Sequence, residues 1–97
     1  MNLTEQEIQL IREYFKNQPV LKAYLFGSYA RGEADAESDI DLLVDLDYSV
    51  HIGLKFFGMY ADLEEKLHRK VDVVSSDGIS KYIKPFIDKD KKLIYAR

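Results

Sequence analysis

The chain has 97 residues, of which 46% are hydrophobic and 32% are charged, and its formal net charge at pH 7 is −3. This size and composition predict a single globular domain over residues 1–97, and the absence of cysteine excludes disulfides and thiolate metal sites. The acidic balance argues against nucleic acid as a direct ligand, and the polar N-terminus without any run near the about 20 apolar residues of a membrane span predicts a cytoplasmic protein that does not enter membranes.

The first residues predict a helix followed by a strand. Thr4 and Glu7 have the spacing of a capping box, and apolar residues then recur at helical spacing. Pro19 ends this helix, because the residue before a proline avoids helical angles. Residues 20–26 are apolar and β-prone, which predicts a strand, and its one charged member, Lys22, favours an edge or a strand end.

The next segment predicts a turn, a short helix and a buried strand. Ser28 is a good N-cap for a helix that runs to about Arg31, where Gly32 would stop it. A polar loop over residues 33–38 leads into residues 40–46, which are nearly all apolar. This run predicts a strand that is buried on both faces.

The second half predicts two further helices and two strands. Ser49 can cap a long helix to about His68, with an apolar stripe formed by Phe56, Tyr60, Leu63 and Leu67. Residues 70–75 predict a strand, residues 79–91 a helix with Pro85 in its first turn or at a kink, and residues 93–95 a last strand. The order α-β-α-β-α-β-α-β predicts an α/β (α+β) fold, a small mixed β-sheet with flanking helices.

Gly27 and Ser28 stand where a strand turns into a helix. Glycine at this position lets backbone N–H groups approach a phosphate, and a helix N-terminus favours its negative charge. The dipeptide alone is weak evidence, since a plain tight turn explains it as well. It is not a Walker A loop, because the Gly-Lys-Ser/Thr ending is missing.

Asp39 and Asp41 flank the start of the predicted buried strand. Residues i and i+2 of a strand point to one face about 7 Å apart, and two such carboxylates favour a divalent cation such as magnesium between them. A calcium loop of the EF-hand type is excluded, because the sixth and twelfth positions are Val44 and Val50. The alternative is two solvent-facing aspartates at a turn and a strand start.

Asp72 interrupts a run of valines, where an unpaired buried carboxylate would be costly. Either this strand is an edge with Asp72 in water, or Asp72 joins Asp39 and Asp41. If the two strands are neighbours, the three acids and the glycine turn form an arrangement used for two-metal phosphoryl or nucleotidyl transfer. The spacing of the two histidines does not indicate a metal site, and the lysine-rich residues 81–92 indicate a solvated helix face and tail.

Three segments together closely resemble the nucleotidyltransferase superfamily related to DNA polymerase β. They are Gly-Ser-Tyr-Ala-Arg-Gly at 27–32, Ser-Asp-Ile-Asp-Leu at 38–42 and Val-Asp-Val at 71–73. Within that superfamily the chain is similar, over essentially its whole length, to the small stand-alone members called minimal nucleotidyltransferases. The resemblance implies the nucleotidyltransferase fold, magnesium as two ions, and ATP as the co-substrate.

The resemblance also implies roles for individual residues. Gly27 and Ser28 would bind the triphosphate. The metal ligands and catalytic acids would be Asp39, Asp41 and Asp72, with Asp72 also serving as the base toward the attacking hydroxyl. Arg31 either contacts phosphate or pairs with one of the nearby acids, Glu33 or Asp35.

Minimal nucleotidyltransferases are often paired with HEPN proteins, which implies an antitoxin that adds AMP to a tyrosine of a HEPN-type ribonuclease toxin. The chain is short, so this partner or a homo-oligomer would supply the acceptor surface. Two alternatives remain open. One is a non-catalytic binding module that neutralises its partner by forming a complex, and the other is a small-molecule nucleotidyltransferase acting on an antibiotic.

Overall fold

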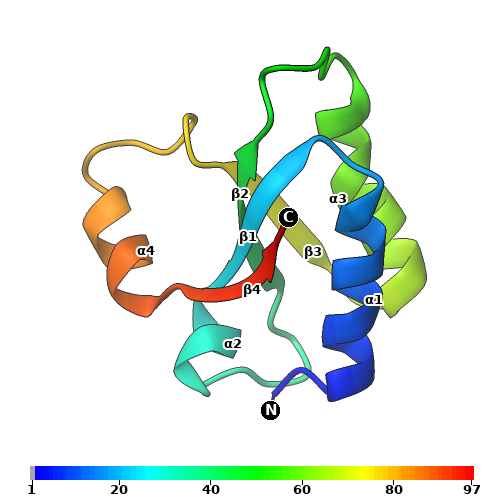
Figure 1. The fold of residues 1–97 in the computed structure, drawn as a ribbon. Coiled ribbons are helices and arrows are strands. Elements are labelled where there is room, and N and C mark those ends of the chain that lie inside the picture. Colours follow the sequence, from blue (N-terminus) through cyan, green and yellow to red (C-terminus); the bar gives the residue numbers. More distant parts are fainter. Residues whose placement is uncertain (1) are drawn as a thin grey trace.

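The computed structural model, which describes residues 2–97, has the predicted alternation of helices and strands (Figure 1). The helices are α1 (Glu5–Lys16), α2 (Ser28–Arg31), α3 (Lys55–Leu67) and α4 (Lys84–Asp90). The strands are β1 (Val20–Phe26), β2 (Ile40–Leu46), β3 (Val71–Ser75) and β4 (Lys92–Ala96). Within the described residues, none of the helices is long and apolar enough to cross a bilayer.

The strands form one sheet in the order β3-β2-β1-β4. β1 is antiparallel to β2 and to β4, whereas β2 and β3 are parallel and are joined through α3. The sheet is therefore mixed and flanked by helices, which confirms the predicted fold class. Of the two alternatives predicted from Lys22, the edge strand is wrong, because β1 lies inside the sheet and Lys22 pairs with Asp45 and Ala96. The exposed Lys22 is the third residue of β1, near the start of the strand.

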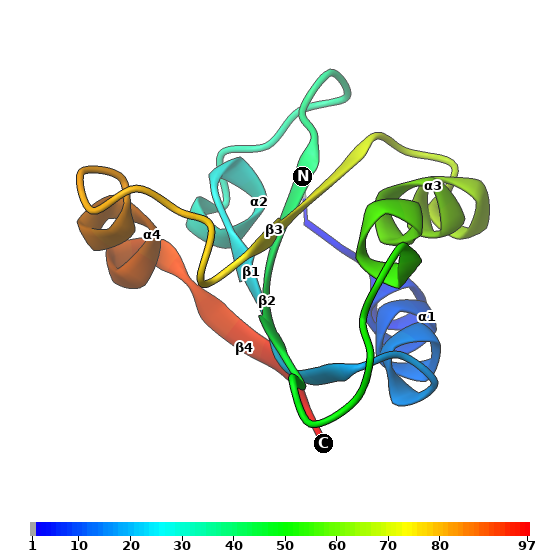
Figure 2. The ribbon, with the colours of Figure 1, turned by 90° about the horizontal axis from the view of Figure 1, so that it is seen from above.

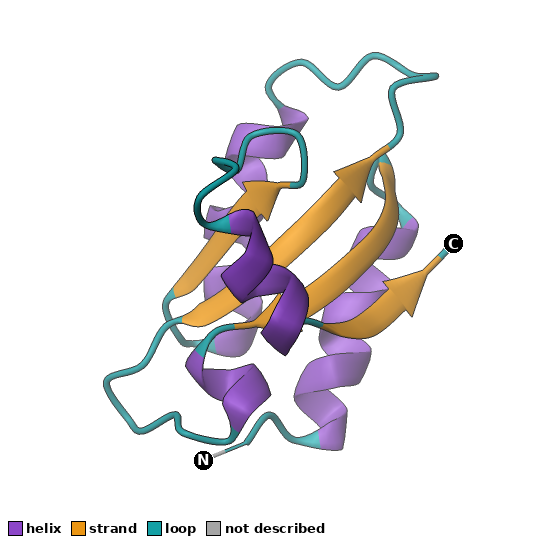
Figure 3. Cartoon of the chain, turned by 90° about the vertical axis from the view of Figure 1, so that its left-hand side faces the viewer, coloured by secondary structure: helices purple, strands orange, loops and turns teal. Residues whose placement is uncertain are grey.

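The two faces of the sheet are covered by different helices. Figures 2 and 3 show α1 and α3 on one face and α2 with α4 on the other. Side chains alternate along a strand, so the buried Ile40, Leu42 and Val44 point into the main core. The intervening Asp41, Leu43 and Asp45 point to the opposite face, which we call the open face. The predicted burial of β2 on both faces is confirmed, since Leu43 is only 2% exposed.

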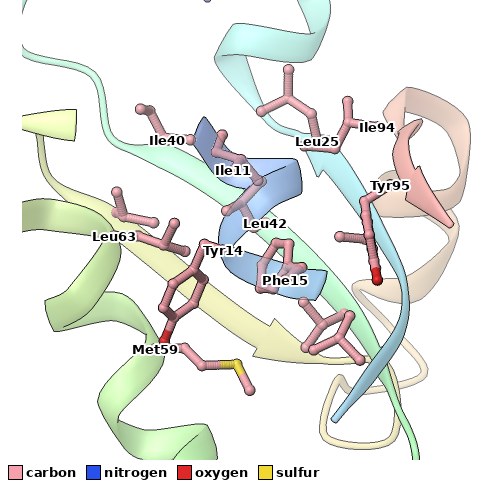
Figure 4. Packing of buried hydrophobic residues seen from close by; sticks show 14 of the residues in the cluster. Ile11, Tyr14, Phe15, Leu25, Ile40, Leu42, Met59, Leu63, Ile94 and Tyr95 are labelled. Carbon is pink, nitrogen blue, oxygen red and sulfur yellow. The ribbon is translucent and has the colours of Figure 1, made fainter. Parts of the chain in front are cut away.

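The main core lies between the sheet and the pair α1 and α3 (Figure 4). Ile11 and Phe15 of α1 and Met59 and Leu63 of α3 are fully buried there. The Tyr14 hydroxyl donates to Oδ2 of Asp62 at 2.6 Å and so links the two helices. Burial and this hydrogen bond raise the pKa of Tyr14 well above its ordinary value. This core packs α1 and α3 against one face of the sheet.

The start of α1 is as predicted, and those of the later helices differ. Oγ1 of Thr4 accepts from the Glu7 amide, and Oε1 of Glu7 accepts from the Thr4 amide, which completes the capping box. The N-cap of α2 is Gly27, so Ser28 is the first helical residue rather than the cap. Ser49 does not start α3, because its amide and hydroxyl both donate to Asp47 in a turn after β2.

Two further details of the predicted helices change. In α3 the buried stripe contains Met59 instead of Tyr60, which is 51% exposed. In α4 the regular helix begins at Lys84 with Pro85 in its first turn, so the predicted start at residue 79 was too early. The carbonyl of Ser80 accepts from the amides of Ile83 and Lys84, so a helical turn precedes α4. Residues 80–83 therefore form a separate turn in front of the regular helix α4.

Candidate active site

Gly27 lies against Asp41 at the end of the sheet where β1 finishes and β2 starts. Phe26 pairs with Asp41 in the antiparallel register, which brings the turn after β1 beside β2. Gly27 has φ +73° and ψ −154°, a conformation essentially restricted to glycine. A Cβ at Gly27 would overlap Oδ2 of Asp41 and lie 3.2 Å from its Cγ. Both the backbone and the neighbouring carboxylate therefore require glycine here.

Helix α2 begins directly at this glycine. The carbonyl of Gly27 accepts from the amides of Ala30 and Arg31 at 3.1 Å each, and Gly32, in the left-handed region, ends the helix. The N-terminus of α2 thus lies beside Asp41, and its partial positive charge favours a phosphate. Ser28, partly buried, adds a hydroxyl at the same place. The arrangement fits the phosphate-binding role predicted for Gly27 and Ser28, and that role stays a prediction.

Asp41 and Asp72 are in register across the parallel strands β2 and β3. Strands in a sheet lie about 4.8 Å apart, so the two carboxylates stand side by side on the open face. The structure therefore brings together the two acids that lie thirty-one residues apart in the sequence. Burial, and then the charges of Asp72 and Asp39, raise the pKa of Asp41 to about 6, against a smaller opposing effect of Arg31.

Asp39 lies in the loop immediately before β2 and is exposed. The strand geometry predicted for the pair therefore applies to Asp41 alone, because β2 starts at Ile40. Asp39 lines a cavity of about 440 Å³ with Tyr29 and with the polar run His68, Arg69 and Lys70. The charge of Asp39 contributes to the raised pKa of Asp41, after burial and the charge of Asp72.

The chemistry of these acids fits a divalent cation. Asp41 ionises against both burial and its acidic neighbours, and a cation would relieve this repulsion. The absence of a side chain at Gly27 lets Oδ2 of Asp41 lie close to the Gly27 backbone. Within residues 2–97, no three His, Asp or Glu side chains are gathered around one point for a metal ion. The donor pair that the structure presents is thus Asp41 with Asp72.

Arg31 is held by two acidic side chains. Its Nε donates to Oε1 of Glu33 at 2.8 Å, and its Nη1 donates to Oδ2 of Asp90 at 2.9 Å. These hydrogen bonds raise the pKa of Arg31. Pairing with Glu33 was one of the predicted alternatives, whereas Asp90 was missed because fifty-nine residues separate the two and no local pattern marks the contact. Arg31 thereby links α2 to the end of α4.

Comparison with known proteins identifies the family of the chain. The Polymerase beta, Nucleotidyltransferase family matches residues 9–97. The protein adenylyltransferase MntA of Thermococcus cleftensis is 37% identical over 82 residues, which cover 79% of this chain and 82% of that protein. MJ0128 of Methanocaldococcus jannaschii, assigned as a protein adenylyltransferase, is 40% identical over 89 residues, or 91% and 85% of the two chains.

Solved structures show the same fold. One described as a minimal nucleotidyltransferase is 26% identical, has a TM-score of 0.76, and covers 90% of this chain and 88% of its own. Another, the MNT antitoxin in complex with the tri-AMPylated HEPN toxin of Shewanella oneidensis, is 18% identical with a TM-score of 0.74, covering 98% and 74%. The fold and site thus define a nucleotidyltransferase. The chain belongs to the polymerase β nucleotidyltransferase family, which confirms the resemblance seen in the three sequence segments.

Proposed function

We propose that this chain transfers AMP from ATP to a tyrosine hydroxyl of a HEPN-type ribonuclease toxin and acts as its antitoxin in the cytoplasm. The observation that carries the proposal is the register pair of Asp41 and Asp72 beside the turn of Gly27. Two adjacent carboxylates and a helix N-terminus are the parts that nucleotidyl transfer needs. The names of the relatives, protein adenylyltransferases, support the choice of a protein acceptor.

The proposed chemistry uses each of these residues. Asp39, Asp41 and Asp72 would hold magnesium, as two ions, which when bound would neutralise charge on the α-phosphate and on the leaving pyrophosphate. Gly27 and Ser28 bind the triphosphate at the N-terminus of α2. The acceptor oxygen bonds to the α-phosphorus, the bond from that phosphorus to the bridging oxygen breaks, and pyrophosphate leaves. The exposed Asp72 accepts the proton of the acceptor hydroxyl.

Intact-protein mass spectrometry tests this proposal. The chain is incubated with ATP, magnesium and a HEPN-type toxin from the same genome, and the toxin is then weighed. We expect a gain of one or more AMP groups, which the Asp41→Asn variant does not produce. Asp45→Asn is the matched control, because Asp45 lies on the same strand and face four residues further along, and it should keep the transfer.

Two results would point to a different function. Neutralisation of the toxin without a gain in mass, and equally by Asp41→Asn, would identify a non-catalytic binding module. AMP transfer to an aminoglycoside but not to the toxin would identify a small-molecule nucleotidyltransferase.

A further inference from the structure

Helix α4 and the turn before it carry large apolar side chains in water. Tyr82, Ile83 and Phe86 are 75%, 54% and 72% exposed. Because the turn at Ser80 already follows a helical path, Tyr82 and Phe86 are neighbours at a spacing of four residues. We call Tyr82, Ile83 and Phe86 the α4 surface. Gathered apolar side chains of this kind mark interaction sites on soluble proteins.

The same segment is positive in an acidic protein. Residues 81–92 contain five lysines and two aspartates, a net charge of +3, so the other residues together carry −6. Both aspartates are engaged, since Asp88 pairs with Lys84 and Lys91 and Asp90 binds Arg31. Lysines flank the apolar side chains, with Nζ of Lys81 5.4 Å from the centre of the Tyr82 ring. The lysine-rich stretch is largely exposed, as the sequence indicates, and it also surrounds the apolar α4 surface with positive charge.

Several contacts fasten α4 to the open face. Ile87 is 5% exposed, and Nζ of Lys91 lies 4.6 Å from the centre of the Tyr24 ring on β1. At the end of the helix, Asp90 binds Arg31 of α2 at 2.9 Å. Figure 3 shows α4 in front of the sheet and α2 near the lower end of the same side. Asp41 points to this side, because its neighbours Ile40 and Leu42 point into the core on the other side. A molecule bound to the α4 surface therefore meets the protein on the side where the nucleotide is expected.

We propose that the α4 surface docks the acceptor protein, through a patch in which apolar side chains are surrounded by acidic ones. The inference rests on the proposed function and names the surface that presents the acceptor to the site. A protein fits better than RNA, because the residues outside 81–92 carry a net charge of −6, which repels a polyanion.

Binding is measured separately from catalysis, by titration calorimetry of the Asp41→Asn variant with the HEPN-type toxin. Adding Phe86→Ser should weaken binding roughly tenfold or more, as truncation of a central interface aromatic does. Lys89→Glu should also weaken it, and more at low salt than at high salt. The matched control is Phe57→Ser, because Phe57 is similarly exposed, at 68%, on α3 behind the sheet. This control should bind like the parent.

Steady-state kinetics of AMP transfer then show whether the substitution affects binding of the toxin or of ATP. With Asp41 intact, Phe86→Ser should raise KM for the toxin and leave KM for ATP unchanged. If the complex depends on Phe86 but no AMP is transferred, the proposed enzyme function is wrong and the docking surface stands.

Equal affinities of the Phe86→Ser and Phe57→Ser variants, or no complex with the toxin at all, would overturn the docking surface. The same holds if Phe86→Ser alters only the oligomeric state in light scattering, or only the binding of a single-stranded RNA. Those two results would identify a contact between copies of this chain or a nucleic-acid site.

Discussion

Gly27 approaches Asp41 so closely that a Cβ on Gly27 would overlap Oδ2 of the carboxylate. Gly27→Ala should therefore displace Asp41 and lower the AMP-transfer rate by at least about 100-fold, the effect of misplacing a reacting group by an ångström. The backbone conformation adds a destabilisation of about 1 to 3 kcal/mol. Transfer rates and thermal unfolding of the same preparation separate the two effects.

Gly32→Ala is the control for that substitution. Gly32 has the same φ of +73°, but a Cβ there would meet no described atom within 4 Å. Its left-handed conformation is also accessible to alanine at about 1 to 2 kcal/mol. Gly32→Ala should lose stability and keep its transfer rate within a few-fold. Equal loss of activity in both variants would show that backbone strain, rather than the space at Asp41, decides.

Asp41 should make the metal-free protein less stable as the pH rises. Its pKa is about 6 in the fold and 3.8 in the unfolded chain. Well below its unfolded pKa it is protonated in both states and contributes nothing. As the pH rises from there through the folded pKa of about 6, the unfolded chain loses the proton first, so the free energy of unfolding falls. Well above that pKa the loss is complete, at about 1 to 2 kcal/mol after solvent screening of a half-buried group.

Replacing Asp41 by asparagine removes this destabilisation. In EDTA at pH 8, Asp41→Asn should therefore unfold at a higher temperature than the wild type, and the difference should shrink toward zero as the pH falls to the unfolded pKa of Asp41 and below. Asp45→Asn, on the same face of β2, is the control for the substitution itself. If Asp41→Asn were no more stable than the wild type at pH 8, the electrostatic account of the acid pair would be wrong.

Magnesium should stabilise the wild type and not Asp41→Asn. A ligand that binds only the folded state raises stability with its concentration, and magnesium would bind the ionised carboxylates of Asp41 and Asp72. The rise in Tm should shrink below about pH 6, because protons then compete for Asp41. EDTA should abolish AMP transfer. The same magnesium-induced rise in both variants would place the metal elsewhere.

Local sequence patterns predicted β1 and β2 to the residue. Each is a short apolar run with clear limits, since β1 lies between Pro19 and Gly27 and a polar loop precedes β2. The first residues of the helices were predicted less accurately than the strands, because a serine caps a helix only if the backbone turns at that residue. The Ser49 side chain instead donates to Asp47, so α3 starts six residues later, at Lys55.

The sequence predicted the site residues directly where they lie within one short stretch of the chain. Gly27, Asp39 and Asp41 lie in one stretch, whereas Asp72 joined them only on the condition that β2 and β3 are neighbours, which the register confirms. The contact between Arg31 and Asp90 depends on how α4 folds back over the open face. No spacing in the sequence encodes such a contact.

The contact between Arg31 and Asp90 should hold α4 in place over the open face. Asp90→Ala leaves Arg31 its partner Glu33 but removes the link from α4 to α2. Hydrogen exchange of α4 amides should become faster while that of α1 stays unchanged, since α1 belongs to the core on the other side of the sheet. If α4 presents the acceptor, KM for the toxin should rise without a change in KM for ATP.

Two further variants decide whether this link matters. Asp88→Ala removes the pairs with Lys84 and Lys91 inside the same segment but no contact to α2, so it should leave the exchange of α4 closer to that of the wild type. In the double variant Arg31→Ala/Asp90→Ala, the α4 amides should exchange no faster than in Asp90→Ala alone, because each substitution removes the same hydrogen bond. Additive effects in the double variant, or equal loosening by Asp88→Ala, would show that Ile87 and general helix stability hold α4, and that Arg31 acts separately at the nucleotide.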